Sequence, residues 1–547
     1  MAPTATVGRS HRGWTLALVC TAVFVLLMNV TIVAVALTSI QDAMDASLSD
    51  LTWVVNAYTL PLAGLVLTAA TLGDRIGRKK VFQVGMAVFT LGSIGCALAQ
   101  NTLSLDVARA VQGIGGTLLF AMTLPLIGAA FPEPRARAGA IGAYGASIAA
   151  ATAVGPLLGG VLVDGPGWRW IFLVTVPVTA VAFVLGFRYL TESRAENARA
   201  MDWPGTVLLV GGLVLLLFGL IQGNSDGWGS TRILTCFSVG AALLVGFVIR
   251  QATAASPMLE LRLFRNRQFV GIILASFGVE AALVSSLNYL AVYVQNGLGY
   301  DAVDAGLRFL PLTLAAFVAA PLAAKVAHKL PDRWLIAIAM VLVAAGAWLM
   351  TGVDGSTTWT HLVPGFVIGG IGLGVISSSA SAASLNAVKP SDAGMATGAV
   401  NTFRRLGTAV GVAVLGAVFE HQVVNDAKDR LAASPEMKEH AAEITEALRA
   451  GAGAKIAEAA PPQGRGALKE LAEAATAAGV DQMLMAGTVL AAGLAALVLV
   501  LMAGRSKAPG RPGPTGPGAH AAPAHPAVGA AATMSSARGD EATVSHR

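Results

Sequence analysis

Long apolar runs recur along the chain, and they limit its fold more than any other feature of the sequence. Each run has about 20 residues, the length that a helix needs to cross the roughly 30 Å hydrocarbon core of a membrane. The 547 residues are 55% hydrophobic and only 12% charged, whereas about a quarter of the residues of a soluble domain are charged. The sequence therefore predicts an all-α polytopic membrane protein in the cell membrane.

The positions of the apolar runs and of the charges between them predict the topology. We expect about 14 spans, at residues 14–40, 51–72, 81–100, 104–130, 138–163, 168–188, 203–222, 231–250, 269–294, 305–327, 333–352, 362–387, 396–419 and 481–503. Lysine and arginine gather in alternate short segments such as "GDRIGRKK" and "EPRARAG", while the opposite segments include the acidic "DAMDASLSD". Because basic loops stay on the cytoplasmic side, both termini are expected in the cytoplasm.

The charges and cysteines exclude several other classes of protein. The net charge of +6 does not indicate a nucleic-acid partner, because the basic residues lie in short segments between spans and not in one patch. Cys20, Cys96 and Cys236 lie in apolar runs without the spacing of a metal site. An ATP-driven pump is excluded because no G-x-x-x-x-G-K-S/T loop occurs. We expect no enzyme, no cofactor and no metal ion.

Two segments lie outside the predicted spans. Residues 420–480 are rich in alanine and glutamate and are expected to form short amphipathic helices in an extracellular loop. This loop is either a solvated helical loop or a lid or partner surface. Residues 504–547 are rich in Pro, Gly and Ala and are expected to be a disordered cytoplasmic tail.

A polar loop joins the second and third spans. Its text, "LGDRIGRKK", combines an acid that can cap a helix end or pair with Arg78 and a glycine that permits a tight turn. The loop residues of interest are Gly73, Asp74, Arg75, Gly77, Arg78 and Lys79. The cations alone are also what any cytoplasmic loop can hold.

Arg109 lies inside the apolar fourth span, in "LDVARAVQGIGG". An arginine there costs about 2.5–3.5 kcal/mol on insertion scales, so it is expected to have a function. The alternative is a side chain that snorkels to the nearby membrane surface.

The fifth span holds "GPLLGG", with Gly155, Pro156, Gly159 and Gly160. The Gly-Pro pair is expected to kink the helix, and the small residues allow close helix packing. Close packing alone would also explain them.

These three motifs resemble signatures of the major facilitator superfamily. Asp74-Arg75-x-Gly77-Arg78-Lys79 is similar to G-x-x-x-D-R-x-G-R-R/K, which implies a latch on the cytoplasmic side carried by Asp74 and Arg78. Arg109-x-x-Gln112-Gly113 resembles R-x-x-Q-G, whose arginine is associated with proton transfer. Gly155-Pro156-x-x-Gly159-Gly160 resembles the antiporter signature of that family.

Other segments resemble the fourteen-helix drug:proton antiporter branch, among them "WRWIFLVTVP", "DWPG" and "AGMATGAVNTFRRLGTAVGVAVLG". Two departures stand out. Asn29 occupies the place of an acid in the first span, and an asparagine cannot carry a proton at physiological pH. Arg405, beside Arg404, stands where glutamine is usual.

The resemblance implies a domain organisation. We expect a cytoplasmic N-terminus at 1–13, a six-helix bundle at 14–190, two inserted helices at 200–252 and a second six-helix bundle at 266–503. The loop at 420–480 and the tail at 504–547 complete the chain.

Glu280 is the one carboxylate expected at mid-depth, about eleven residues or 16 Å into the ninth span. Burial favours the neutral form of a carboxyl group, whereas a nearby arginine favours the charged form. Such a group can couple transport to protons or recognise a cation. Alternatively, Glu280 is permanently paired with Arg404 or Arg405, or the helix register is misplaced.

The sequence therefore predicts a proton-coupled antiporter that exports amphipathic drugs or antibiotics, cationic or polyaromatic ones, by alternating access. Glu280 and Arg109 are the proton-coupling candidates. The substrate-cavity candidates are the polar residues Asn29, Asn56, Tyr58, Gln112, Asn288, Tyr289, Asn401 and Arg404. The partners are the substrate, protons and the lipid bilayer, and a monomer is expected to function. A symporter or a metabolite exporter of the same fold is the alternative; a membrane receptor without transport would need neither the acid nor the latch.

Overall fold

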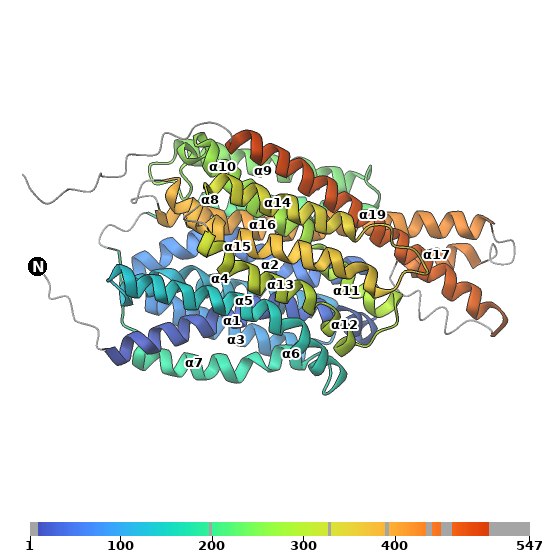
Figure 1. The fold of residues 1–547 in the computed structure, drawn as a ribbon, viewed down its shortest axis with the longest axis horizontal. Helices are drawn as coiled ribbons and strands as arrows, with labels where there is room; N and C mark the ends of the chain where they lie inside the picture. The colour runs from blue at the N-terminus through green and yellow to red at the C-terminus, as the bar shows by residue number, and fades with distance from the viewer. Residues whose placement is uncertain are drawn as a thin grey trace, which may run out of the picture. The chain divides into compact units, whose positions relative to one another are not determined.

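The structure is a computed structural model that describes residues 9–195, 200–326, 330–388, 393–433, 440–449 and 462–502. Fourteen helices in these ranges are long and apolar enough to cross a membrane, and the described residues contain no strand (Figure 1). This confirms the predicted all-α polytopic fold. The predicted tail, 504–547, lies outside the described residues.

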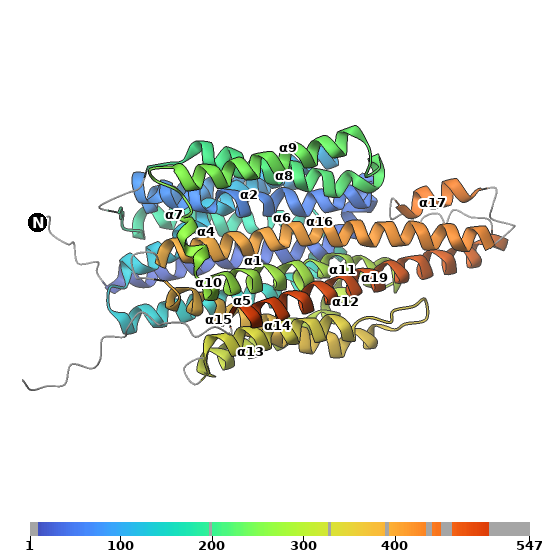
Figure 2. The same cartoon turned by 90° about the horizontal axis from the view of Figure 1, so that it is seen from above.

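The first half of the chain is built from long helices joined by short turns. These are α1 (Arg9–Met44), α2 (Leu48–Ile76), α3 (Arg78–Leu98), α4 (Thr102–Ala130), α5 (Pro134–Asp164), α6 (Trp170–Leu173), α7 (Thr175–Tyr189), α8 (Trp203–Asp226) and α9 (Thr231–Thr253). Helix α4 packs on α2 and α3, and α5 packs on α1. The helices α8 and α9 lie side by side, and α8 contacts α2 and α16 (Figure 2).

The second half begins with the 3₁₀ turn η1 (Leu261–Arg265) and contains a span made of four consecutive helical pieces. The pieces are α10 (Arg267–Val279), η2 (Glu280–Val284), α11 (Ser286–Val292) and η3 (Tyr293–Gly297). After it come α12 (Ala302–Arg308), α13 (Leu310–Val326), α14 (Asp332–Leu349), η4 (Trp359–Leu362), α15 (Val363–Asn386), α16 (Ala393–Ala433), α17 (Ala441–Arg449) and α19 (Pro462–Met502). Helix α15 packs on α13 and α14, and α19 packs on α14 and α16. The limits of the two predicted bundles stay a prediction.

Two helices differ from the predicted spans at 396–419 and 481–503. Helices α16 and α19 have 41 residues each, so each is about 62 Å long at 1.5 Å per residue, twice the hydrocarbon core of a membrane. They therefore continue into segment 420–480 as single helices that pack against each other, with the short α17 beside α16 (Figure 2). The cause is an apolar face that continues past the span, where Phe419, Val423, Ala427 and Leu431 are all buried.

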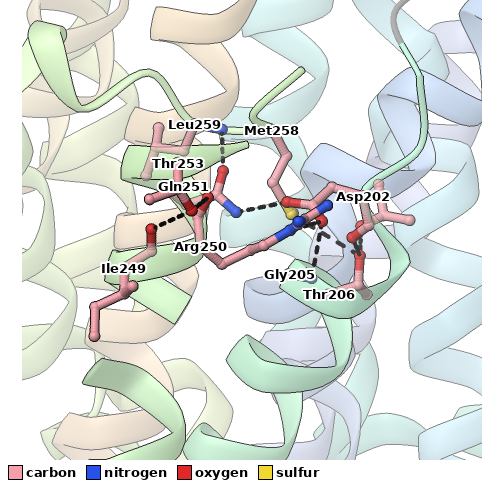
Figure 3. A network of polar contacts seen from close by, with 10 residues as sticks. Asp202, Gly205, Thr206, Ile249, Arg250, Gln251, Thr253, Met258 and Leu259 are labelled. Carbon is pink, nitrogen blue, oxygen red and sulfur yellow. Dashed lines mark hydrogen bonds and ion pairs between the residues drawn. The ribbon is translucent and has the colours of Figure 1, made fainter. Parts of the chain in front are cut away.

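A polar network fixes the ends of α8 and α9 (Figure 3). The Asp202 carboxylate caps α8 by accepting a hydrogen bond from the Gly205 amide (3.0 Å), and it also accepts from Arg250 Nε (3.0 Å) and Gln251 Nε2 (2.8 Å). Gln251 in turn accepts from the Leu259 amide (3.1 Å). Burial opposes the charged form, but the hydrogen bonds from Gly205, Arg250 and Gln251 lower the pKa of the Asp202 carboxyl. The segment after α9 is thereby tied to the start of α8.

Candidate transport site

Glu280 is buried in the middle of its span and forms an ion pair. Its Oε1 lies 2.5 Å from Arg404 Nε of α16, and its Oε2 accepts a hydrogen bond from Thr408 Oγ1 (3.1 Å). Arg404 also donates to Ser377 Oγ of α15 (2.9 Å). Of the two arginines considered as partners, the structure therefore pairs Glu280 with Arg404, and both carboxylate oxygens are occupied.

The backbone around Glu280 explains why helix α16, which carries Arg404, can pack so close to it. Glu280 opens the π-helical turn η2, where both the amide and the hydroxyl of Ser285 donate to the Glu280 carbonyl (3.0 and 2.9 Å). Helix α16 passes very close here, since a Cβ at Gly411 would lie 2.5 Å from the Ala281 carbonyl oxygen and one at Gly407 would lie 2.4 Å from a backbone oxygen of α10. Two glycines one turn apart thus bring α16 against the π turn, a feature often found at functional sites.

Arg405 is also buried, but it has no such partner. Its Nε lies out of contact with solvent and forms no hydrogen bond with the residues that the structure describes. Its guanidinium lies over the Phe120 ring of α4, whose centroid is 5.8 Å from Cζ. Adjacent residues of a helix point about 100° apart, so Arg404 faces Glu280 while Arg405 faces the helices of the first half.

Arg109 lies at the centre of a second buried cluster. Its guanidinium donates to three neutral oxygens: the Val54 carbonyl (3.0 Å), Asn29 Oδ1 (2.5 Å) and Gln112 Oε1 (2.8 Å). Its Cζ also lies 4.3 Å from the centre of the Tyr58 ring. Arg109 is 1% exposed, so it points into the protein and does not snorkel. The structure thus brings together four of the predicted residues.

Neutral groups extend this cluster. Gln112 Nε2 donates to Ser93 Oγ on α3 (2.8 Å). The amide nitrogens of Asn29 and Asn56 are buried and have no hydrogen-bond partner among the described residues. Because Asn29 replaces an acid, no carboxylate is within hydrogen-bonding distance of Arg109 in the described structure; Asp106, one turn away, acts on it only at longer range.

Two small pockets hold the remaining cavity candidates. Asn288 and Tyr289 of α11 line one pocket between α1, α2 and α16. Asn401 lines the other, together with Glu280 and Arg404. The described residues hold no cluster of three or more His, Cys, Asp or Glu side chains that could bind a metal ion.

The loop between α2 and α3 forms the ion pair that its sequence suggests. Arg78 donates to Asp74 Oδ1 through Nε (3.1 Å) and Nη2 (2.8 Å). Gly77, with φ of +120°, ends α2 and begins α3, a backbone conformation that favours glycine. Gly73 is buried against Met122, and Arg75 is exposed.

The segment after α7 completes this loop, and the sequence had not indicated it. Glu192 accepts from the Lys79 amide (3.1 Å), and Lys79 Nζ donates to the Phe187 carbonyl (2.8 Å). The Ser193 carbonyl accepts from the Arg78 amide (3.0 Å). The signal was the acid of "LTESRAE" directly after the sixth span, opposite a cationic loop.

The small residues of α5 allow close contacts on two sides. Gly155 and Gly159 pack on Thr31 and Ile32 of α1, and a Cβ at Gly160 would lie 2.4 Å from the Ala302 carbonyl oxygen. Helix α5 is continuous through the Gly-Pro pair. Close packing therefore accounts for the position of each glycine.

The end of α5 is tied to α12 from the second half. The Asp164 carboxylate accepts from the amides of Ala302 (3.3 Å) and Val303 (2.8 Å), the first residues of α12. Gly306 packs on the Pro156 carbonyl one turn further along. A carboxylate at a helix N-terminus is stabilised by the free amides and the helix dipole, so this contact is a joint between the halves.

Known families match this chain over most of its length. The model of the Major Facilitator Superfamily matches residues 19–412. The methylenomycin A resistance protein of Streptomyces coelicolor is 34% identical over 72% of this chain and 82% of that protein. The tetracenomycin C resistance and export protein of Streptomyces glaucescens is 32% identical over 77% and 79%. The puromycin resistance protein of Streptomyces alboniger is 34% identical over 75% and 82%.

Solved structures share the fold. A bacterial homologue of the human lysosomal transporter Spinster, in an inward-facing and occupied conformation, superposes with a TM-score of 0.59 at 17% identity, over 90% of this chain and 97% of that one. A peptide transporter in complex with sulfate gives 0.59 at 14% identity, over 90% and 96%. At these identities the likeness concerns the fold alone.

The family match, the relatives and the helical fold agree with one another. The protein is a multi-pass transporter of the cell membrane, not an enzyme. The chain belongs to the major facilitator superfamily.

Proposed function

We propose that this transporter exports amphipathic drugs or antibiotics in exchange for protons, by alternating access. The relatives named for resistance to methylenomycin A, tetracenomycin C and puromycin support the class of cargo and the direction. The observation that carries the coupling is the ion pair of Glu280 with Arg404, buried at a π turn in mid-span.

In this mechanism Glu280 alternates between two states. As a carboxylate it holds Arg404 and Thr408 of α16. A proton on Glu280 removes the negative charge, so the ion pair is lost and Arg404 keeps its hydrogen bond to Ser377. Each inward charge gains about 2.3 kcal/mol per 100 mV of membrane potential, which is enough to bias the two states.

The contact between α5 and α12 is the proposed gate at one end of the cavity. It consists of the Asp164 cap on the first amides of α12 and of the Gly160–Ala302 contact. These are few and reversible interactions, so the two halves can separate there without unfolding either helix. The proposed latch at the opposite gate is the Asp74–Arg78 pair of the loop between α2 and α3.

The test uses the Glu280→Gln variant. A growth-inhibition panel of a sensitised strain first identifies a compound that the full chain exports. Uptake of that compound into inside-out vesicles is then measured with and without an imposed pH gradient. We expect the wild type to respond to the gradient and Glu280→Gln to lose at least ten-fold of the gradient-driven rate.

The matched control is Asp426→Asn, which removes another carboxylate–arginine pair of α16, with Arg430. It is expected to export at the wild-type rate. If Glu280→Gln exports at that rate and still responds to the gradient, Glu280 is not the coupling residue. If the wild type exports nothing from the panel, the proposed export function is wrong.

A further inference from the structure

Arg405 is a buried cation that has no hydrogen-bond or ion-pair partner among the described residues. The residue is 6% exposed, and among the described residues it has no ion pair or hydrogen bond, only the ring of Phe120 at 5.8 Å. A buried charge without a partner is strongly destabilising, and intramembrane arginines nearly always have one. Arg405 therefore requires an explanation that Arg404 and Arg109 do not.

The mid-span carboxylate acts on Arg405 only at longer range. Both oxygens of Glu280 are taken by Arg404 and Thr408. Arg109 is satisfied by neutral oxygens and has Asp106 at longer range. Three arginines within the spans thus share one mid-span carboxylate, and Arg405 is the one whose buried Nε donates no hydrogen bond to a described residue.

The groups facing Arg405 are aromatic and come from the first half. Besides the Phe120 ring of α4, the hydroxyls of Tyr58 on α2 and Tyr144 on α5 act on its charge, which also interacts at longer range with Glu280 and Arg404 of the second half. Each hydroxyl has a local partner: Tyr58 donates to the Leu26 carbonyl (3.1 Å), and Tyr144 lies 3.2 Å from the Thr123 hydroxyl. Neither can balance a full charge, but their rings offer flat apolar faces.

We propose that Arg405 binds an anionic oxygen group of the transported molecule, so that the substrates are aromatic organic acids. This inference rests on the proposed export function and replaces the expectation of cationic substrates. A guanidinium matches a carboxylate in geometry and charge, and the aromatic body of the substrate would lie against Phe120 and Tyr144. Export of an anion is also favoured by a membrane potential that is negative inside.

The test compares acids with their uncharged esters on the full chain in lipid nanodiscs. The probes are 1-pyrenebutyrate, 9-anthracenecarboxylate and 2-naphthoate, each beside its methyl ester. For at least one pair we expect the wild type to bind the acid at least ten-fold more tightly than the ester. Arg405→Gln should weaken binding of the acid at least ten-fold and leave the ester within two-fold, and Arg405→Lys should keep part of the preference.

Thermal unfolding guards against a folding defect. Without ligand, Arg405→Gln is expected to melt no lower than the wild type, because it removes an unpaired buried charge. The acid should raise the melting temperature of the wild type and of Arg430→Gln, a control at the far end of α16, but not that of Arg405→Gln. Should Arg405→Gln fail to fold, Arg405→Met gives the same comparison.

Three outcomes would overturn the inference: no acid binds the wild type more tightly than its ester, Arg405→Gln leaves the acid preference intact, or it weakens acid and ester alike. The last result would assign Arg405 to the charge balance of Glu280. Vesicle transport separates the two proposals. Gradient-driven export of esters but not of acids would keep the export function and refute the role of Arg405, whereas acid binding without gradient-driven export would do the reverse.

Discussion

Arg109 on α4 and the Arg404–Arg405 pair on α16 both place guanidinium groups inside the protein, but their surroundings differ. Arg109 is held by three neutral oxygens and the Tyr58 ring. Arg404 is held by a carboxylate, and Arg405 by no polar group of the described residues. Neutral amides cannot change charge at physiological pH, whereas a carboxylate can. We therefore propose a structural role for the first cluster and the change of charge during transport for the second.

The largest effect on stability is expected from a substitution that breaks the second cluster. Glu280→Leu leaves Arg404 inside the span without its carboxylate, so it should destabilise the protein by about 3–5 kcal/mol. Thermal unfolding of the purified protein in detergent measures this. Adding Arg404→Leu to Glu280→Leu should restore most of the loss, because the pair is then removed as a whole. Wild-type stability of Glu280→Leu alone would show that the ion pair is not needed for the fold.

The corresponding change in the first cluster is Asn29→Leu. It removes one acceptor of the Arg109 guanidinium and should cost about 1.5–3 kcal/mol of stability. Export should keep its response to the pH gradient, since no titratable group is lost.

Thr408→Val, which removes the hydrogen bond to Glu280 in the second cluster, should instead shift the pH dependence of export. If Asn29→Leu altered the response of export to the pH gradient and Thr408→Val did not, Arg109 and not Glu280 would be the coupling residue.

A smaller effect is expected from the packing that holds the second cluster together. Gly411→Ala forces α16 away from the π turn, because its Cβ would lie 2.5 Å from the Ala281 carbonyl oxygen. We expect a loss of about 1–3 kcal/mol, as for other overpacked positions. Gly493→Ala on α19 is the control, since nothing lies within 4 Å of its Cβ. Equal melting temperatures of the two variants would contradict the tight approach.

The smallest effect concerns an ion pair at the edge of a span, between Asp202 and Arg250. The pKa of Asp202 is lowered in the folded protein, so its charged form stabilises the fold above the unfolded value of about 3.9, and this contribution is lost as the pH falls further. Asp202→Asn should therefore cost about 1 kcal/mol at neutral pH, and the difference should shrink as the pH falls below about 3.9 towards the lowered pKa of the folded protein.

Melting curves from pH 7 to pH 3 measure this difference. Asp226→Asn, at the other end of the same helix hairpin, is the control, because its pair with Arg232 is partly exposed and should contribute little. If Asp202→Asn also altered gradient-driven export, the edge pair would belong to the transport machinery.

The fold could be predicted well because its cause is local. Inside a membrane each backbone polar group must be bonded within its own segment, so a run of about 20 apolar residues becomes a helix whatever its neighbours are. Outside the membrane this constraint does not apply, and there the prediction was less accurate. Segment 420–480 is polar enough to be read as a loop, yet α16 and α19 continue through part of it, because buried residues such as Phe419 and Val423 repeat on one face of α16.

The candidate site could be predicted only in part. Depth along a span follows from counting residues, and this singled out Glu280 and Arg109. The partners of the latch loop, Glu192 and Ser193, lie more than a hundred positions away, and the only sign of the contact in the sequence is an acid that follows the sixth span opposite a cationic loop. Arg405 was noticed as a departure from the usual glutamine, but its lack of a partner is a property of its surroundings.

The sequence by itself determined that the chain crosses the membrane about fourteen times, that one acid, Glu280, lies at mid-depth, and that Arg109, Arg404 and Arg405 lie within apolar spans. Only the tertiary structure decided which arginine meets the acid. Arg404 and Arg405 are neighbours on one helix and are equivalent in depth, so the choice depends on how α16 is rotated about its axis. Gly407 and Gly411 set that rotation by packing on α10 and η2, which turns Arg404 towards Glu280 and leaves Arg405 facing Phe120.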